Sequence, residues 1–231
     1  MKIVVVIPAL NEEASIEPVI AAIPAHLAFE IVVVDNGSTD ATAACARAAG
    51  ATVLQASPPG YGRACFVGAA YALDRGADVV VFLDADFSDD PREMTDLVAP
   101  IVRGEADLVV GSRLRGGLVP GAMPWHARFG NRLVSAMVNK RYGLALTDLG
   151  PFRAVRAQLY RRLAMREMTY GWPVEMLAKA ARSDARVAEI SVSYRQRIGQ
   201  SKISGTVKGT IGATYFLLTR TFLYARWMPD R

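Results

Sequence analysis

Residues 77–86 read Ala-Asp-Val-Val-Val-Phe-Leu-Asp-Ala-Asp, and this stretch decides the fold. Its five consecutive apolar residues, 79–83, follow a Gly-Ala-Asp turn, which predicts a strand buried on both faces. The strand ends on Asp84 and Asp86, whose carboxylates can point the same way because only Ala85 separates them. The stretch therefore predicts a pair of carboxylates at the carboxyl end of a buried strand.

Two carboxylates at one point raise each other's pKa unless a cation lies between them. Their hard oxygen atoms favour Mg²⁺ or Mn²⁺, and Mg²⁺ is often held by one or two carboxylates together with substrate phosphates. The simpler alternative is a polar loop whose acids cap the next helix, and an isolated Asp-x-Asp does not exclude it. Further motifs in the sequence are needed to distinguish a metal–diphosphate site from a loop that caps a helix.

The first half of the chain alternates between strand and helix patterns. This rhythm predicts βαβ units, and so an α/β fold with a mostly parallel central sheet flanked by helices. The expected strands are residues 3–7, 30–34, 51–55, 78–83 and 107–110, and the expected helices are 11–23, 40–49, 64–74 and 91–103.

Polar clusters at residues 11–13, 35–38, 84–86 and 112–113 each follow an expected strand. Ligands of such sheets bind outside the carboxyl ends of the strands, so we expect these clusters to meet at one edge. Asp35 is suited to bind ribose hydroxyls or a base N–H, and the next helix offers its N-terminus to an anion. A turn with a helix cap at Asp40 is the simpler interpretation of the same segment.

Basic residues form a further group of candidates. Gly60-Tyr61-Gly62-Arg63 is typical of a phosphate-binding loop or of an ordinary strand–helix turn. Arginines match phosphate oxygens bidentately, although a run of charges is more often a solvated face. The arginines in question after the carboxylate strand are Arg113, Arg115, Arg128 and Arg132.

The second half begins with a Gly- and Pro-containing loop, 112–125, which we expect to be mobile over the site. Helices are expected at 125–142 and 173–182, an irregular segment or strand at 147–155, and a half-buried strand at 187–194. Residues 206–227 predict a final amphipathic helix, either lying at an anionic interface or packed on the domain. The expected division is a nucleotide-binding half, 1–111, an acceptor half, 112–205, and a terminal helix, 206–231.

Composition narrows the class of protein. The 231 residues are 52% hydrophobic and 21% charged, which is typical of a globular chain, and the net charge of +5 predicts an anionic partner. Nucleic acid is disfavoured because aromatic residues are not interleaved with cations. We expect Cys45 and Cys65 to be small core residues of a protein in a reducing compartment. With no apolar stretch near the length that spans a bilayer, we expect a cytoplasmic protein, peripheral at the inner face of the membrane at most.

Several motifs together resemble family 2 glycosyltransferases of the GT-A fold, with a Rossmann-like nucleotide-binding half. The resemblance covers nearly the whole chain, and its later motifs are similar to polyprenyl-phosphate (dolichyl-phosphate) sugar transferases. The motifs are residues 6–13 (Val-Ile-Pro-Ala-Leu-Asn-Glu-Glu), 34–40 (Val-Asp-Asn-Gly-Ser-Thr-Asp), 84–86, 111–113 (Gly-Ser-Arg), 148–154 (Asp-Leu-Gly-Pro-Phe-Arg-Ala) and 194–206. Two departures are Asn36, where a second carboxylate is common, and the absence of the transmembrane helices of some relatives.

The resemblance implies a role for each matching residue. Glu175 is implied as an acidic base, and Asp86 as a more direct ligand than Asp84 for Mg²⁺ or Mn²⁺. Arg113 and Arg128 are implied to face an acceptor phosphate. The residues implied to bind the nucleotide sugar are Pro8, Ala9, Glu12, Asp35, Arg63, Asp84, Ala85, Asp86, Arg195, Arg197, Ser201 and Lys202.

The resulting hypothesis is metal-dependent transfer of a sugar from a UDP- or GDP-sugar to a polyprenyl phosphate, with inversion. One alternative is a hydroxyl acceptor activated by Glu175, since a hydroxyl needs a base and a phosphate does not. A nucleotidyltransferase is disfavoured because residues 8–13 lack glycine and cations. A binding module without catalysis, contact with a membrane surface and homodimerisation stay open at this point.

Overall fold

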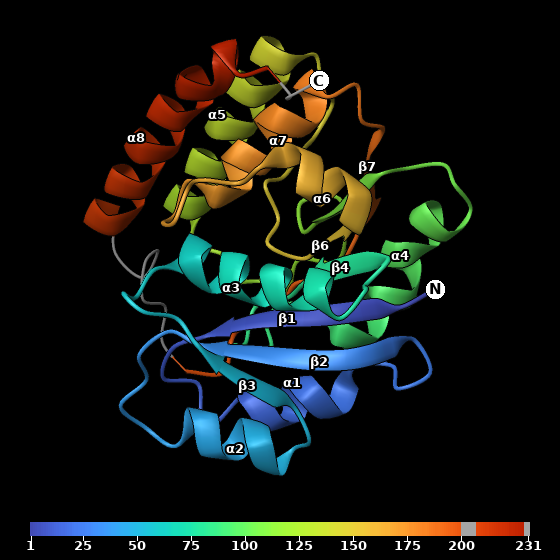
Figure 1. Cartoon of the computed structure of the whole chain (residues 1–231). Helices are drawn as coiled ribbons and strands as arrows, with labels where there is room; N and C mark the ends of the chain where they lie inside the picture. Colours follow the sequence, from blue (N-terminus) through green and yellow to red (C-terminus); the bar gives the residue numbers. More distant parts are fainter. Residues whose placement is uncertain (200–206, 229–231) are drawn as a thin grey trace.

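The structure is a computed structural model, and it describes residues 1–199 and 207–228 (Figure 1). Its described strands form one seven-stranded sheet of order β3-β2-β1-β4-β6-β5-β7, in which β6 alone runs antiparallel to its neighbours. The strands are β1 Ile3–Ala9, β2 Ala28–Asp35, β3 Thr52–Gln55, β4 Val79–Phe82, β5 Leu108–Ser112, β6 Arg153–Arg156 and β7 Val187–Ser191. The predicted α/β fold with a mostly parallel sheet is confirmed.

Helices cover both faces of this sheet (Figure 1). They are α1 Ile16–Ala22, α2 Thr42–Ala48, α3 Tyr61–Asp74, α4 Met94–Val102, α5 Trp125–Tyr142, α6 Ala157–Leu163, α7 Trp172–Arg182 and α8 Val207–Leu223, with 3₁₀ turns η1 Pro91–Glu93 and η2 Tyr224–Arg226. No helix among the described residues is long and apolar enough to cross a membrane.

Two hydrophobic cores lie on opposite faces of the sheet because strand side chains alternate. On β1, Val4 and Val6 belong to the core under α3, α5, α6 and α7, whereas Val5 and Ile7 belong to the core under α1, α2 and α4. The apolar runs that predicted doubly buried strands are explained by this arrangement.

The parallel strands bring their carboxyl ends to one edge. Ala9 pairs with Asp35 where β1 and β2 end, and Val6 of β1 pairs with Phe82 where β4 ends. Strand β6 enters the sheet at the same edge, because Arg153 at its start pairs with Phe82. Gly150 permits this approach, since a Cβ there would meet the carbonyl oxygen of Gly111 at 2.0 Å. The polar clusters thus meet as predicted.

Several predicted boundaries are wrong. The helix expected at 11–23 begins only at Ile16, because Asn11 has a φ of 52° and its side chain accepts a hydrogen bond from the Thr39 N–H at 2.8 Å. Helix α6 was not predicted. Within the segment 147–155, predicted to be irregular or a strand, the strand begins only at Arg153. Because β6 lies between β4 and β5, both predicted halves build one sheet, and the domain division stays a prediction.

Candidate active site

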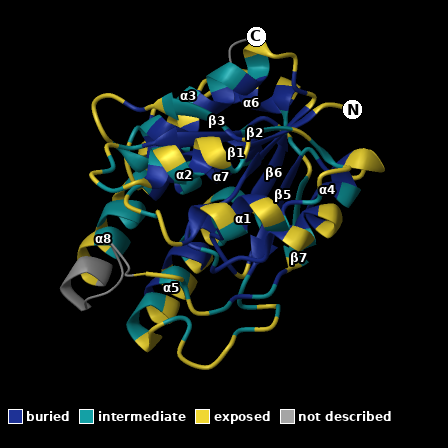
Figure 2. Ribbon diagram, turned by 90° about the horizontal axis from the view of Figure 1, so that it is seen from below, coloured by how far each residue is buried: buried dark blue, intermediate teal, exposed yellow. Residues whose placement is uncertain are grey.

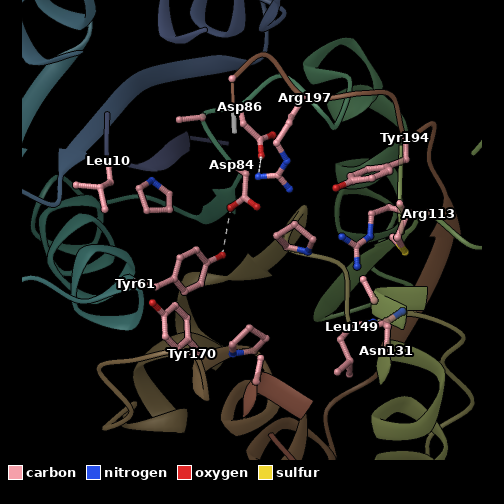
Figure 3. Close-up of a pocket in the computed structure, with 18 of the residues that line it drawn as sticks. Leu10, Tyr61, Asp84, Asp86, Arg113, Asn131, Leu149, Tyr170, Tyr194 and Arg197 are labelled. Atoms are coloured by element: carbon pink, nitrogen blue, oxygen red, sulfur yellow. Dashed lines mark hydrogen bonds and ion pairs between the residues drawn. The ribbon is translucent and has the colours of Figure 1, made fainter. Parts of the chain in front are cut away.

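A cleft of about 850 Å³ opens at the edge where the polar clusters meet (Figure 3). Asp84 and Asp86 lie on one side of it, and Arg113 and Asn131 on the other. A cavity of this size suits a nucleotide-sized ligand with few placed polar groups. The predicted site residues that line the cleft are Pro8, Ala9, Glu12, Asp84, Ala85, Asp86, Arg113 and Arg197.

The carboxylate pair follows directly from β4. Asp84 accepts a hydrogen bond from the Tyr61 hydroxyl at 3.3 Å, and Asp86 accepts one from the Ser88 N–H at 2.9 Å. The guanidinium of Arg197 lies 2.7 Å from the other Asp86 oxygen. Burial, and then the charge of Asp86, raise the pKa of Asp84 to about 7. A cation would relieve this cost, because it favours the charged form of both groups.

The donor set fits a divalent cation that is shared with a substrate. Within residues 1–199 and 207–228, no group of three or more His, Cys, Asp or Glu side chains could hold a metal ion. Asp84 and Asp86 would therefore supply two oxygen ligands, leaving the remaining positions to water and phosphate. Mg²⁺ is commonly bound in this way, by one or two carboxylates together with substrate phosphates.

The nucleotide side of the cleft is formed by the ends of β1 and β2. Asp35 does not line the cleft; its carboxylate accepts hydrogen bonds from the Ser38 N–H at 2.9 Å and the Gln55 amide at 2.8 Å. Asn36 lines the cleft instead, and its side chain accepts a hydrogen bond from the Gly60 N–H at 2.6 Å. Asp35 thus shapes the turn that presents Asn36, and a nucleotide contact of its own stays a prediction.

The opposite side is built around Arg113. Its guanidinium donates two hydrogen bonds of 2.8 Å to Asp148, and it stacks on the Tyr194 ring at 5.1 Å. Asn131 of α5 donates a third hydrogen bond to Asp148 at 2.7 Å. Burial opposes the charged form of Asp148, but Arg113 and these hydrogen bonds hold its pKa below the usual value. The arrangement fixes one cation in place at the cleft wall.

Other predicted residues are not brought to the cleft wall as the structure describes it. Arg63 and Arg128 do not line the cleft, and Arg128 is exposed on α5. Arg195 forms an ion pair with Asp90 and lies over the Phe87 ring at 5.1 Å. Ser201 and Lys202 lie outside the described residues.

Glu175, the predicted base, lies away from the cleft wall. Its side chain is fully buried in α7 and pairs with Lys179 at 2.7 Å, and it does not line the cleft. It also accepts hydrogen bonds from the backbone N–H groups of Arg166 at 2.9 Å and Glu167 at 2.7 Å. A role for Glu175 as the acidic base stays a prediction, and the structure describes no contact between its carboxylate and the cleft. Glu175 holds in place the loop that leads to Thr169 and Tyr170, which do line the cleft.

Sequence reasoning missed Tyr61, Asn131 and Tyr194 as cleft residues. No sequence signal indicated Asn131, because helical spacing places Ala127 and Asn131 on one face of α5 but does not say which face lines the cleft. Sequence reasoning also missed Asp89, which is buried with neither carboxylate oxygen hydrogen-bonded within the described part of the chain. Burial raises the pKa of Asp89 well above the usual value, while the charge of Arg113 acts in the opposite direction.

Comparisons with known proteins agree with this geometry. Residues 4–169 match the family described as "Glycosyl transferase family 2". An uncharacterized glycosyltransferase of Mycobacterium tuberculosis is 40% identical over 90% of this chain and 93% of its own length. The undecaprenyl-phosphate mannosyltransferase of Micrococcus luteus is 31% identical over 98% of this chain and 96% of its own.

Solved structures of glycosyltransferases have a similar fold. Glucosyl-3-phosphoglycerate synthase from Mycobacterium tuberculosis, in complex with Mn²⁺, UDP and phosphoglyceric acid, superposes with a TM-score of 0.78 at 26% identity. The match covers 99% of this chain and 80% of that one. A further structure of that protein contains Mg²⁺ and UDP. Divalent metal use is thus supported by neighbours of the same fold. This chain belongs to glycosyl transferase family 2, and it is a glycosyltransferase.

Proposed function

We propose that this enzyme transfers a sugar from a nucleoside diphosphate sugar to a polyprenyl phosphate, with Mg²⁺ or Mn²⁺ bound at Asp84 and Asp86. The observation that carries the proposal is the composition of the cleft. One wall presents the carboxylate pair and the other presents Arg113, while Leu149, Pro151 and Leu217 add apolar surface. A substrate pair with a diphosphate, a monophosphate and a hydrocarbon chain matches all three features.

The donor belongs at the carboxylate wall. When bound, the cation neutralises charge on the leaving diphosphate. Pro8, Ala9 and Glu12 are near enough to the same wall to contact the nucleoside. Arg197 is held beside the site by Asp86 and is the described cation available to the diphosphate there. The base and the sugar are not fixed by these residues.

The acceptor belongs at the Arg113 wall. A phosphate monoester is already anionic near neutral pH, so its oxygen can attack without a strong base. The enclosed position of Glu175 is consistent with this acceptor, because no base is required. Similarity to undecaprenyl-phosphate mannosyltransferase supports the same class of acceptor. Attack in a single displacement would invert the anomeric configuration.

A second candidate acceptor is a small hydroxy acid that carries a phosphate. The glucosyl-3-phosphoglycerate synthase structure contains phosphoglyceric acid, and Arg113 could equally bind an acceptor's phosphate or carboxylate. This reaction requires activation of a hydroxyl, which Glu175 does not supply from its buried position. The apolar surface of the cleft also favours the lipid.

A panel of labelled UDP- and GDP-sugars with Mn²⁺ tests both candidates. Each donor is incubated with a short-chain polyprenyl phosphate or with 3-phosphoglycerate, and product is separated by extraction into organic solvent. We expect labelled lipid with one donor, no product from Asp86→Ala, and normal activity from Asp96→Asn, whose carboxylate is exposed on α4. Product in the aqueous phase alone would favour the second candidate. Absence of both products with every donor would overturn the proposal.

A further inference from the structure

Acidic residues are segregated away from two tracts of the chain. The 22 Asp and Glu residues all lie outside residues 108–147 and 190–229, and each of these tracts contains six Lys or Arg. Helix α5 belongs to the first tract and α8 to the second. The two helices pack against each other, so both tracts meet in space (Figure 1). Acids from other segments pair with Arg113, Arg195, Arg197 and Arg220. Exposed cations of α5 have no acidic partner within the described part of the chain, and they are Arg128, Arg132, Lys140 and Arg141.

Both helices carry exposed residues (Figure 2), and several of these residues are large and apolar. On α5, Trp125 is 76% exposed and Phe129 65%. On α8, Ile211 is 64% exposed and Tyr215 71%. Each pair is spaced by four residues and so occupies one side of its helix. We call Trp125, Phe129, Ile211 and Tyr215 the α5–α8 face. Large apolar side chains exposed on two helices that pack against each other indicate an interaction surface.

The cleft runs beside this face. Ala127 and Asn131 of α5, and Ala213 and Leu217 of α8, line the cleft. Each helix thus contributes one side to the cleft and exposes large apolar residues elsewhere on its surface. The cleft lining and the α5–α8 face therefore share the same two helices.

Helix α8 and the residues after it contact other parts of the molecule through charged and polar groups. Arg220 forms an ion pair with Glu167 at 2.8 Å, and the Tyr142 hydroxyl donates to the Thr221 carbonyl oxygen at 2.5 Å. Past its end, the Lys179 ammonium lies over the Trp227 ring at 5.0 Å. A contact made by α8 would consequently orient the whole cleft.

We propose that the α5–α8 face docks on an anionic phospholipid bilayer and so presents the cleft to the polyprenyl phosphate. The biological role of this docking rests on the proposed function, whereas docking itself can be measured without substrates. Aromatic and aliphatic groups enter the headgroup region, while neighbouring cations are attracted to anionic lipids. A second copy is the poorer occupant, because a two-fold contact apposes the same surface of both subunits, and here it would bring together the exposed cations of both α5 helices.

Vesicle co-sedimentation without substrates tests the docking. The vesicles contain phosphatidylcholine alone or with phosphatidylglycerol, and we expect binding mainly to the second kind. Phe129→Ser combined with Tyr215→Ser should weaken binding at least about tenfold, and Arg132→Gln about fivefold. Val102→Ser is the matched control, since Val102 is 58% exposed on α4, and its binding should equal that of the wild type.

Each outcome bears on the proposal. Unchanged vesicle binding by the double variant, or no binding by the wild type, would overturn it. So would a dimer in sedimentation velocity that the double variant dissociates, because the face would then be a subunit contact. Transfer to a dispersed short-chain polyprenyl phosphate is measured separately. Its failure alongside normal docking would refute the proposed acceptor and not the docking surface.

Discussion

The guanidinium of Arg113 makes two hydrogen bonds, each 2.8 Å long, to the fully buried carboxylate of Asp148. Asn131 donates to the same carboxylate from α5, and the Arg113 N–H donates to it as well. The pair therefore joins the end of β5, the segment before β6 and helix α5. Arg113 is oriented before any acceptor binds, which lowers the cost of ordering it during the reaction.

Asp148→Asn should destabilise the fold and disorder Arg113. Removing one partner of a buried ion pair costs about 3–5 kcal/mol in the free energy of unfolding, because the other charge remains uncompensated. Denaturant unfolding measures this loss. Arg103→Gln is the control, since Arg103 and Glu105 form an exposed pair and exposed pairs contribute little. Equal midpoints for Asp148→Asn and the wild type would refute the structural role of the pair.

Asp86→Asn should abolish metal-dependent nucleotide binding. The substitution removes a negative charge that favours the cation. We expect the gain in UDP affinity on adding Mn²⁺ to be smaller than in the wild type by a factor of at least about 100. Calorimetric titration of UDP with and without Mn²⁺ measures the difference. Asp96→Asn serves as the matched control because its carboxylate is exposed on α4. A normal Mn²⁺ effect in Asp86→Asn would remove Asp86 from the metal site.

The sheet and the carboxylate site were predictable because their signals are local. Short apolar runs rich in β-branched residues and bounded by turns favour buried strands. Helices between successive strands make those strands parallel, which brings their carboxyl ends to one edge. Asp84, Asp86 and Arg113 each follow such a strand directly, and the structure places all three in the cleft.

The remaining side chains depend on contacts between distant segments. Arg128 lies on the helix that lines the cleft, but on an exposed part of it, and no local pattern specified which side of α5 faces inward. Glu175 is a different case. Lys179 follows it by four residues, a spacing typical of a helical ion pair, and this signal was available in the sequence.

Stability without metal should fall as pH rises from about 4 to about 7. The pKa of Asp84 is about 7 in the folded protein, chiefly because of burial, and near 3.9 in the unfolded chain. Between these values the folded state binds a proton that the unfolded state lacks, so raising the pH favours unfolding. The raised pKa of Asp89 acts in the same direction.

Asp84→Asn isolates this contribution. The variant should be more stable than the wild type at pH 8, where Asp84 carries a buried charge, and the difference should shrink toward pH 4. Unfolding midpoints across that range, measured with chelator present, provide the test. Parallel profiles for Asp84→Asn and the wild type would show that Asp84 titrates normally, whereas Asp96→Asn should run parallel in any case.

Glu175→Gln separates a structural role from a catalytic one. The substitution leaves the Lys179 ammonium buried without its counter-charge, so we expect a loss of about 3–5 kcal/mol in the free energy of unfolding. Lys179→Met in the same chain should recover part of this loss, because the uncompensated charge is then removed. A double-mutant cycle on unfolding measures the coupling between the two residues.

Activity of the folded fraction completes this test. If Glu175 only supports the 166–169 loop, transfer to polyprenyl phosphate should persist in Glu175→Gln, with its main effect on KM through Thr169 and Tyr170. A base would instead show a large fall in kcat and the loss of one limb of the pH–rate profile. That result, obtained with a variant as stable as the wild type, would show that Glu175 acts as a base and would favour a hydroxyl acceptor.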